Sequence, residues 1–485
     1  MGGNYEKGIY NQLMDVMVRL DNMEKDLKAE KKEHKEDVDR LNKKIDSLTQ
    51  ENQVLKDDNA RLKSIINNDS SNTSLPPSTD QKGGKAANTY NGRNKTGRKA
   101  GGQKGHKGKT LTKSYVQKKI ESGEFRHDIH NIGNPSHKKY ITKYALDLDV
   151  VPVIKEIRIY ADKNGHFSVP SEYQSDVTYG ENIKAMAVAL YSEGVMSNDK
   201  IAAFLNAISG NRIELSEGSV YGFCRKFAKE SVVSVEHLEN ELLNQNVVAT
   251  DATVTTTNGK QSYIRNFSIH NTVVYHAMRS KSVKALQEIN FLGKYTGILV
   301  HDHETALYHF GTDHAECNVH LIRYLRKNSE DTGNPWSGQM IDLLCKMNRN
   351  RKTLIEKGVT SFSEKVIEEY EKQYHNLITE GRKQNKKTCA RYAKKEEKTL
   401  LNRLEKYSRN HLLFLHNFEV LFDDNISERD LRKVKNRQKM AGGFRKDSGQ
   451  EMYCTILTII ETLKRRKMGL LENIRKIFMG TPAIF

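Results

Sequence analysis

The sequence predicts a multidomain α+β protein that binds a polyanion, and three observations support this prediction. The chain has 485 residues, more than one hydrophobic core normally organises. Its formal net charge is +18, which favours a nucleic-acid partner. An N-terminal heptad pattern gives way to apolar, strand-like runs in the middle of the chain and to charged helical segments after them.

Residues 5–67 keep one heptad register with leucine at nearly every d position. Leucine at d with β-branched residues or Asn at a is typical of a parallel two-stranded coiled coil. We therefore predict a homodimer or larger assembly; a single surface helix is the alternative. The d positions are Leu13, Leu20, Leu27, His34, Leu41, Leu48, Leu55 and Leu62.

Residues 68–113 are polar, aperiodic and rich in turn formers, which predicts a disordered basic linker. From 81 to 113 there are ten Lys or Arg residues and no acid. Such a segment can follow a phosphate backbone closely and release its counterions; a solubilising tail is the alternative. The predicted DNA contacts here are Arg93, Arg98, Lys99, Lys104, His106, Lys107 and Lys109.

Residues 114–178 contain alternating or apolar runs at 144–151 and 154–160, which predict a small β-rich module. His127 and His130 have the spacing of metal ligands. Because no cysteine lies in this segment, zinc is not expected there.

Residues 179–235 read as three short helices in a helix-turn-helix arrangement. Ser197 and Ser216 are the expected caps of the second and third helices. The third helix would read DNA through Arg225 and Lys226 on its outer face. Any small helical bundle gives a similar pattern.

Residues 240–330 carry strand signals, and two of their apolar runs end on an acid. Residues 247–251 end at Asp251, and residues 297–302 end at Asp302. Antiparallel strands, a helix and a further strand follow the order of a ribonuclease-H-like catalytic core. Residues 331–410 read as a helical insertion, and 411–485 as the second part of the core with Glu428 and a C-terminal helix.

Asp251, Asp302 and Glu428 would together form an all-oxygen site for hard divalent cations. Two Mg²⁺ ions in such a site support phosphodiester chemistry, and Mn²⁺ is expected to substitute. Each acid has an alternative role. Asp251 could be a turn residue, Glu304 or Asp313 could replace Asp302, and Glu428 could pair with Arg432 at i,i+4.

The segment 429–446 holds eight basic residues and one acid, which predicts a strip that holds DNA by its phosphates. Cys317 and His320 form a CxxH pattern after the second acid, with structural packing and ordering of the site as the two open roles. The predicted DNA contacts in the strip are Arg432, Lys435, Arg437 and Lys439.

The five cysteines are scattered without a CxxC pair, which argues against a disulfide framework. No apolar run approaches the ~20 residues of a membrane span. We therefore expect a cytoplasmic protein without a membrane partner.

Over nearly its whole length the chain resembles the transposases of the insertion sequence 66 family of bacterial mobile elements. The matching segments are 70–78, 101–109, 314–320 and 428–432 with the basic run that follows. The resemblance implies a DDE transposase with a ribonuclease-H-like core that uses Asp251, Asp302 and Glu428. It also implies Mg²⁺-dependent cleavage at element ends, transfer of the 3′ hydroxyl to target DNA, and accessory proteins encoded by related elements. Family members carry a cysteine zinc module near 120–175, which this chain lacks.

The expected function is therefore that of a transposase that binds double-stranded DNA at element ends and at a target. The alternative from another class is a catalytically inactive DNA-binding protein derived from a transposase. A structure-specific nuclease is a third possibility, although it would not need so large an apparatus for recognising DNA ends.

Overall fold

A computed structural model describes residues 3–68, 72–73, 112–130, 132, 141–146, 148, 150–170 and 173–481. These residues form a mixed α+β structure with a long N-terminal helix and a five-stranded sheet, which confirms the predicted α+β class. The chain divides into two compact units. One contains the N-terminal helix with 320–350 and 363–408; the other contains the described part of 112–319 with 351–362 and 409–485.

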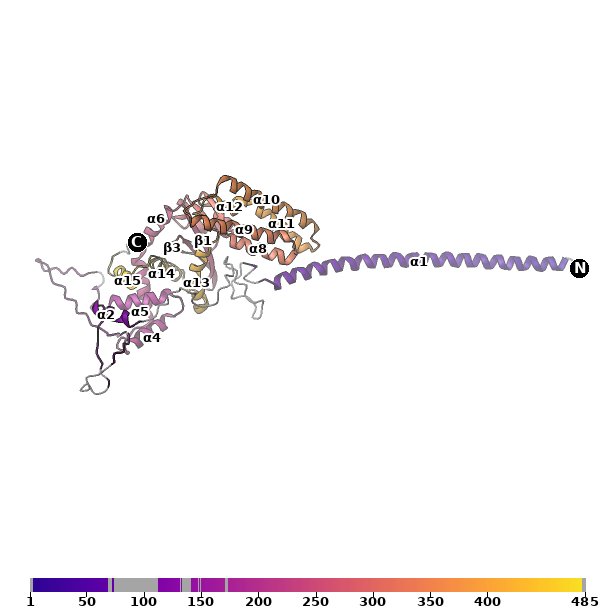
Figure 1. Ribbon diagram of the computed structural model, residues 1–485. Helices are drawn as coiled ribbons and strands as arrows, with labels where there is room; N and C mark the ends of the chain where they lie inside the picture. Colours follow the sequence, from indigo (N-terminus) through magenta and orange to yellow (C-terminus); the bar gives the residue numbers. More distant parts are fainter. Residues whose placement is uncertain are drawn as a thin grey trace. The chain divides into compact units, whose positions relative to one another are not determined.

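Helix α1 (Gly3–Ile66) is one uninterrupted helix (Figure 1). Pairs of opposite charge at i,i+4, such as Asp21 with Lys25 at 2.7 Å, support it along its length. The leucines of the predicted d positions are exposed, with Leu13 at 57% and Leu41 at 56%. An exposed apolar stripe of this length is typical of a helix that pairs with another chain.

The described residues between 112 and 178 include helix α2 (Lys113–Glu121), whose N-cap Thr112 accepts the Tyr115 N–H. Among the described residues that follow α2 in this segment, the predicted strands do not form. Apolar side chains that suggested them are exposed, as Ile154 is at 98%. An alternating pattern becomes a strand only where a partner strand pairs its backbone and a second layer covers its apolar face.

Four helices precede the sheet: α3 (Glu181–Ser192), α4 (Asn198–Ile208), α5 (Glu217–Glu230) and α6 (Val232–Leu243). The first three correspond to the three helices that the sequence predicts. Ser216 caps α5 by accepting the Ser219 N–H. Val188, Ile201, Val220 and Phe227 of the first three helices are fully or almost fully buried in the core of this unit.

The sheet has the order β3-β2-β1-β4-β5. Strands β1, β2 and β3 are antiparallel, whereas β4 runs parallel to β1, and β5 runs parallel to β4. Between β3 and β4 lie α7 (Val283–Gln287) and a 3-10 turn at Leu292–Lys294, and a second 3-10 turn at Thr305–His309 precedes β5. The strands are β1 (Val247–Thr257), β2 (Lys260–Ser268), β3 (Val273–Met278), β4 (Ile298–His301) and β5 (Asp313–Glu316).

Strand β1 does not end at Asp251, as the sequence predicted, but continues to Thr257. The reason is the dipeptide Asn258-Gly259, in which both residues have positive φ. Such a pair forms the two-residue turn that suits the twist of a hairpin. The hairpin therefore extends β1 beyond the acid, and Asp251 lies within the strand opposite Asn266 of β2.

Helices α13 (Asn425–Ala441), α14 (Asp447–Arg465) and α15 (Leu470–Phe478) complete this unit. Helix α13 packs on β1 and β2, and α14 covers β3. The hydroxyls of Thr458 and Thr462 accept the N–H groups of Tyr275 and Val273, so the helix pairs backbone groups at the edge of the sheet. A covered edge cannot recruit another strand.

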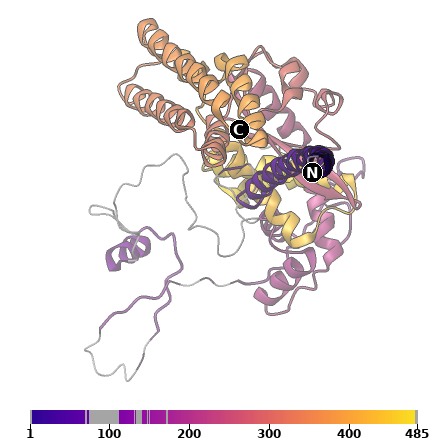
Figure 2. The same cartoon turned by 90° about the vertical axis from the view of Figure 1, so that its right-hand side faces the viewer.

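The other unit is built on α8 (Asn318–Thr332), α9 (Pro335–Ile355), α10 (Glu364–Lys387) and α11 (Arg391–Lys406), of which the ends of α8 and α9 lie in the sheet unit. Helices α10 and α11 pack along each other, as the long orange helices of Figure 2 show. Helix α12 (Ser408–His416) then leads back into the sheet unit. The helices expected in 331–410 are therefore present.

A fully buried carboxylate, Glu397 of α11, organises this helical unit. Its oxygens accept hydrogen bonds from the Trp336 indole at 2.7 Å, the Asn334 amide at 2.7 Å and the Asn385 amide at 2.9 Å. Asn328 and Thr388 also donate to it. Burial alone would raise the pKa of Glu397, but these hydrogen bonds lower it below its usual range.

Candidate metal and nucleic-acid site

The register of two parallel strands sets Asp251 beside Asp302. Val248 of β1 pairs with Leu299 of β4, and Ala249 pairs with Val300. Asp251 lies two residues after Ala249, and Asp302 lies two residues after Val300. The two acids therefore occupy matching positions on one face of the sheet. Neighbouring strands lie about 5 Å apart. Asp302 comes directly after β4, as the sequence predicted.

Backbone N–H groups orient both carboxylates. An oxygen of Asp251 accepts the N–H of Ala252 at 2.7 Å, and an oxygen of Asp302 accepts the N–H of His303, also at 2.7 Å. Each bond joins a side chain to the next residue in sequence, which restricts its rotation. Both residues are partly exposed, so solvent or a ligand can reach them.

Glu428 lies in the first turn of α13, and the buried amide of Asn266 joins this turn to Asp251. The side-chain oxygen Oδ1 of Asn266 accepts the Asp251 N–H at 3.1 Å. Its NH₂ donates to the Ser427 carbonyl and to the Asp430 carboxylate, both at 3.2 Å. The fully buried side chain of Asn266 thus connects β1, which carries Asp251, to α13, which carries Glu428.

Cys317 makes a second connection, between the end of β4 and the start of α13. Its N–H donates to the carbonyl of His301, which precedes Asp302, at 2.9 Å. Its sulfur accepts the N–H of Asp424, the N-cap of α13, at 3.3 Å. Cys317 is therefore hydrogen-bonded to both segments, the one that ends at Asp302 and the one that leads to Glu428. His320 is also buried, on α8 in the helical unit.

A further acid, Asp424, lies beside this group. Its side chain is only 2% exposed, and its Oδ1 has no hydrogen-bond partner. Burial raises the pKa of Asp424 well above its usual range, and the negative charges of Asp251 and Glu428 raise it further. In the part of the chain that the structure describes, no three His, Cys, Asp or Glu side chains form a ready-made metal cage.

The two acids that could have replaced Asp302 are paired with cations instead. Glu304 accepts hydrogen bonds from the buried Arg265 and from Lys281. Burial would raise the pKa of Glu304, but these two cations hold it below its usual range. Asp313 accepts the Arg409 guanidinium at 2.6 Å. Both carboxylates are therefore already neutralised by side-chain cations.

The basic run of α13 divides into an outer and an inner set. Arg432, Lys435 and Lys439 are exposed, and their i, i+3, i+7 spacing puts them on one helix face. Lys433 instead pairs with Glu193 at 3.0 Å and with Glu461 at 2.7 Å.

Arg437, which was also predicted to contact DNA, is half-buried, and its guanidinium lies over three aromatic rings. Its guanidinium lies 4.4 Å from the ring centroid of Tyr191, 5.0 Å from that of Tyr453 and 5.6 Å from that of Phe444. A guanidinium stacked on three aromatic rings contributes to packing. Local sequence pattern does not indicate this role, because the three rings come from separate elements.

The remaining predicted DNA contacts lie on α5 and in the basic linker. Arg225 is exposed on α5, and Lys226 beside it is half-buried. The linker contacts lie outside the described residues: Arg93, Arg98, Lys99, Lys104, His106, Lys107 and Lys109.

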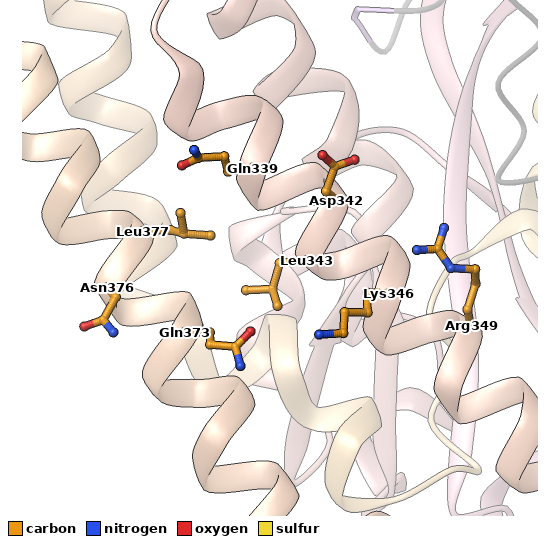
Figure 3. A pocket seen from close by; sticks show the side chains of 8 residues that line it. All are labelled: Gln339, Asp342, Leu343, Lys346, Arg349, Gln373, Asn376 and Leu377. Atoms are coloured by element: carbon orange, nitrogen blue, oxygen red, sulfur yellow. The ribbon is translucent and has the colours of Figure 1, made fainter.

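The helical unit contains a separate groove of about 480 Å³ between α9 and α10 (Figure 3). Leu343 and Leu377 contribute apolar surface, while Lys346, Arg349 and Asp342 give it mixed charge. None of the residues predicted to act in catalysis or DNA binding lies in it. No helix in the described ranges is long and apolar enough to cross a membrane.

Sequence reasoning missed Asn266 and Asp424. Asn266 sits within a strand, where only the pairing of Asp251 with Asn266 reveals its position. Asp424 did carry a signal, since an Asp directly before an Asn-initiated helix is a typical N-cap. That signal pointed to capping, yet its side chain makes no cap hydrogen bond.

Comparisons with known proteins identify the family of the chain. No curated protein matches the chain. A family model described as "Transposase IS66 family" matches residues 177–452, which include the helices before the sheet, all five strands and Glu428. The match covers more than half of the chain and confirms the resemblance seen in the sequence. The chain belongs to the IS66 family of transposases and is therefore a DNA-processing, DNA-binding protein.

Proposed function

We propose that this chain cleaves DNA at the ends of an insertion sequence and joins them to a target by a DDE mechanism. Asp251, Asp302 and Glu428 are its catalytic acids. One observation carries the proposal: the parallel register of β1 and β4 puts Asp251 and Asp302 at matching positions, and the helix of Glu428 packs on the same strand.

The sheet supports a ribonuclease-H-like assignment for this core. Its order is β3-β2-β1-β4-β5, with an antiparallel hairpin half and a parallel half that meet at β1 and β4. In that arrangement the first acid lies on the central strand and the second follows the neighbouring parallel strand. Residues 240–330 would form the first part of the core, 331–410 the insertion and 411–485 the second part.

The acids fit a pair of hard divalent cations, because the group of carboxylates includes a buried oxygen, Oδ1 of Asp424, that lacks a partner. When bound, Mg²⁺ or Mn²⁺ makes water or a 3′ hydroxyl more acidic and stabilises the leaving oxygen. Asp251 and Asp302 would hold the cations from the sheet, and Glu428 from α13. Asn266 and Cys317 keep these segments at a fixed separation. We assign no zinc site.

DNA would lie along the outer face of α13, where Arg432, Lys435 and Lys439 are exposed in the same helix as Glu428. This placement brings phosphates close to the acids. Helices α3–α5 would act as the helix-turn-helix, with α5 and its exposed Arg225 as the reader. The basic linker would add phosphate contacts that are independent of sequence.

The proposal is tested by giving the full-length protein a labelled DNA fragment that carries its element end. With Mg²⁺ we expect a nick at the element boundary and, with target DNA added, a joined product. With EDTA neither product should form. If the protein binds the fragment but cuts under neither Mg²⁺ nor Mn²⁺, the chain is instead a catalytically inactive DNA-binding protein.

The outer face of α13 gives a salt-dependence prediction. Changing Arg432 and Lys439 together to Ala should weaken DNA binding and make the slope of log K against log salt shallower. The expected change is about 0.9 for each DNA phosphate that the variant no longer neutralises. Fluorescence anisotropy at several salt concentrations measures this slope. The control is Lys28→Ala, which removes an exposed positive charge from α1. Equal slopes for the wild type and the double variant would contradict the assigned DNA path.

The exposed leucine stripe of α1 gives a prediction about assembly. We propose that α1 pairs in parallel with α1 of a second copy. Changing Leu41 and Leu48 to Glu puts charges at two d positions that the pairing would bury, and should yield monomers. Light scattering after size-exclusion chromatography measures the mass. Lys32→Glu changes an exposed b position on the opposite side of the helix and should stay dimeric. A wild-type protein that runs as a monomer at micromolar concentration would refute the pairing.

A further inference from the structure

The carboxylate of Asp424 is buried, and one of its oxygens makes no hydrogen bond to the residues that the structure describes. The residue is the N-cap of α13 and is 2% exposed, and its Oδ1 has no hydrogen-bond partner. A buried polar atom without a partner is costly, so such atoms are uncommon and often mark a functional position.

The backbone of Asp424 is fixed on both sides. Its N–H donates to Cys317 Sγ at 3.3 Å, and its carbonyl accepts the Glu428 N–H at 3.1 Å. Because Asp424 and Glu428 are four residues apart at the start of one helix, their side chains share a helix face. The adjacent Ser427 carbonyl accepts the Asn266 amide of β2, so this turn lies against the sheet.

Three neighbouring acids raise the pKa of Asp424 in addition to burial: Asp251 most, then Glu428 and the preceding Asp423. The nearby Ser427 hydroxyl lowers it. Carboxylates at such short range repel one another unless cations lie among them.

We propose that Asp424 is a fourth carboxylate ligand of the divalent-cation site formed by Asp251, Asp302 and Glu428. The inference rests on the proposed function. The unpartnered Oδ1 supplies the oxygen donor that hard cations prefer. Four carboxylates also balance the charge of two divalent cations, whereas three leave an excess positive charge.

A purely structural role would make Asp424 a helix cap. An N-cap side chain accepts an N–H of the first turn, but the Asp424 side chain makes no such bond. The two roles differ in their effect on cation binding when the charge is removed. If Asp424 is only a cap, Asn or Ser in its place leaves cation binding unchanged. If its carboxylate is a ligand, the same changes weaken that binding.

The test compares Asp424→Asn and Asp424→Ser with the full-length wild type, without DNA. Both substitutes are good N-caps but carry no carboxylate. The melting temperature in EDTA should equal or exceed that of the wild type. Mn²⁺ binding, followed by electron paramagnetic resonance and calorimetry, should weaken at least tenfold or lose one ion, and Mg²⁺ should no longer raise the melting temperature as it does for the wild type.

The matched control is Asp423→Asn at the preceding residue. The Asp423 side chain is partly exposed and accepts the Asn425 N–H at 3.2 Å. An asparagine can make the same hydrogen bond, so this variant should bind Mn²⁺ like the wild type.

Two results would overturn the role of Asp424. One of them would leave the proposed function intact, and the other would overturn that function as well. If the wild type binds Mn²⁺, Asp251→Asn weakens that binding, and both Asp424 variants bind normally, then Asp424 is not a ligand while the proposed function stands. If the wild type itself binds no Mn²⁺ at millimolar concentration, the metal-dependent function fails together with the role of Asp424.

Discussion

Asp251→Asn is expected to abolish DNA cleavage and joining while leaving DNA binding intact. The amide has the same shape, and its oxygen can still accept the Ala252 N–H that Asp251 accepts at 2.7 Å. The Asp251 backbone N–H keeps its bond to Asn266. Only the negative charge is removed, and a neutral amide binds a hard cation weakly. We expect cleavage to slow at least about a thousandfold, or roughly 4 kcal/mol of transition-state stabilisation.

The measurement is single-turnover cleavage of a labelled element end, with binding followed separately by anisotropy. Asp313→Asn is the control, because it makes the same chemical change on β5, where the carboxylate pairs with Arg409 rather than with the acid group. That variant should keep most of its activity. Normal cleavage by Asp251→Asn, or equal losses in both variants, would rule out the assigned first ligand.

Glu397→Ala should unfold much of the helical unit. Five side chains donate to this buried carboxylate, and the substitution leaves all of them without their acceptor. Each buried donor without a partner costs about 1–3 kcal/mol. Even with partial relaxation and water entry, we expect a loss of at least about 3 kcal/mol.

Hydrogen exchange measured by mass spectrometry is the suitable readout, because a two-unit chain need not unfold in a single step. Protection in α10 and α11 should fall sharply, whereas protection in β1–β3 should stay close to wild type. Glu396→Ala removes an exposed carboxylate from the same helix and should change stability by less than about 0.5 kcal/mol. Unchanged protection of α10 in the Glu397 variant would show that the carboxylate does not hold the unit together.

The three acids that we propose as catalytic could be singled out from the sequence because each carries a local mark. Asp251 and Asp302 follow runs of apolar residues, and Glu428 begins a basic helix. The spacing of apolar residues in strands and helices is a local property of the sequence. It can therefore be recognised without knowledge of the tertiary structure. The same reasoning located α1, α3–α5 and the helices of residues 331–410.

Three predictions needed information that local pattern does not contain. The strands expected in 114–178 do not form among the described residues, because pairing depends on partners elsewhere in the chain. Strand β1 passes through Asp251 because the Asn258-Gly259 turn extends the hairpin. Arg437 turns inward because Tyr191 and Tyr453 form a place for its guanidinium.

By itself the sequence determined the family of this protein, its basic character, its long heptad helix and the three acids that we assign to catalysis. The tertiary structure decided how Asp251 and Asp302 come into register, which side chains face outward on α13, and that Asn266, Cys317 and Asp424 surround the acids. Hydrophobic period and charge are encoded residue by residue along the chain. Register, burial and the partner of each polar atom are properties of pairs of residues far apart in sequence, so they exist only once the chain has folded.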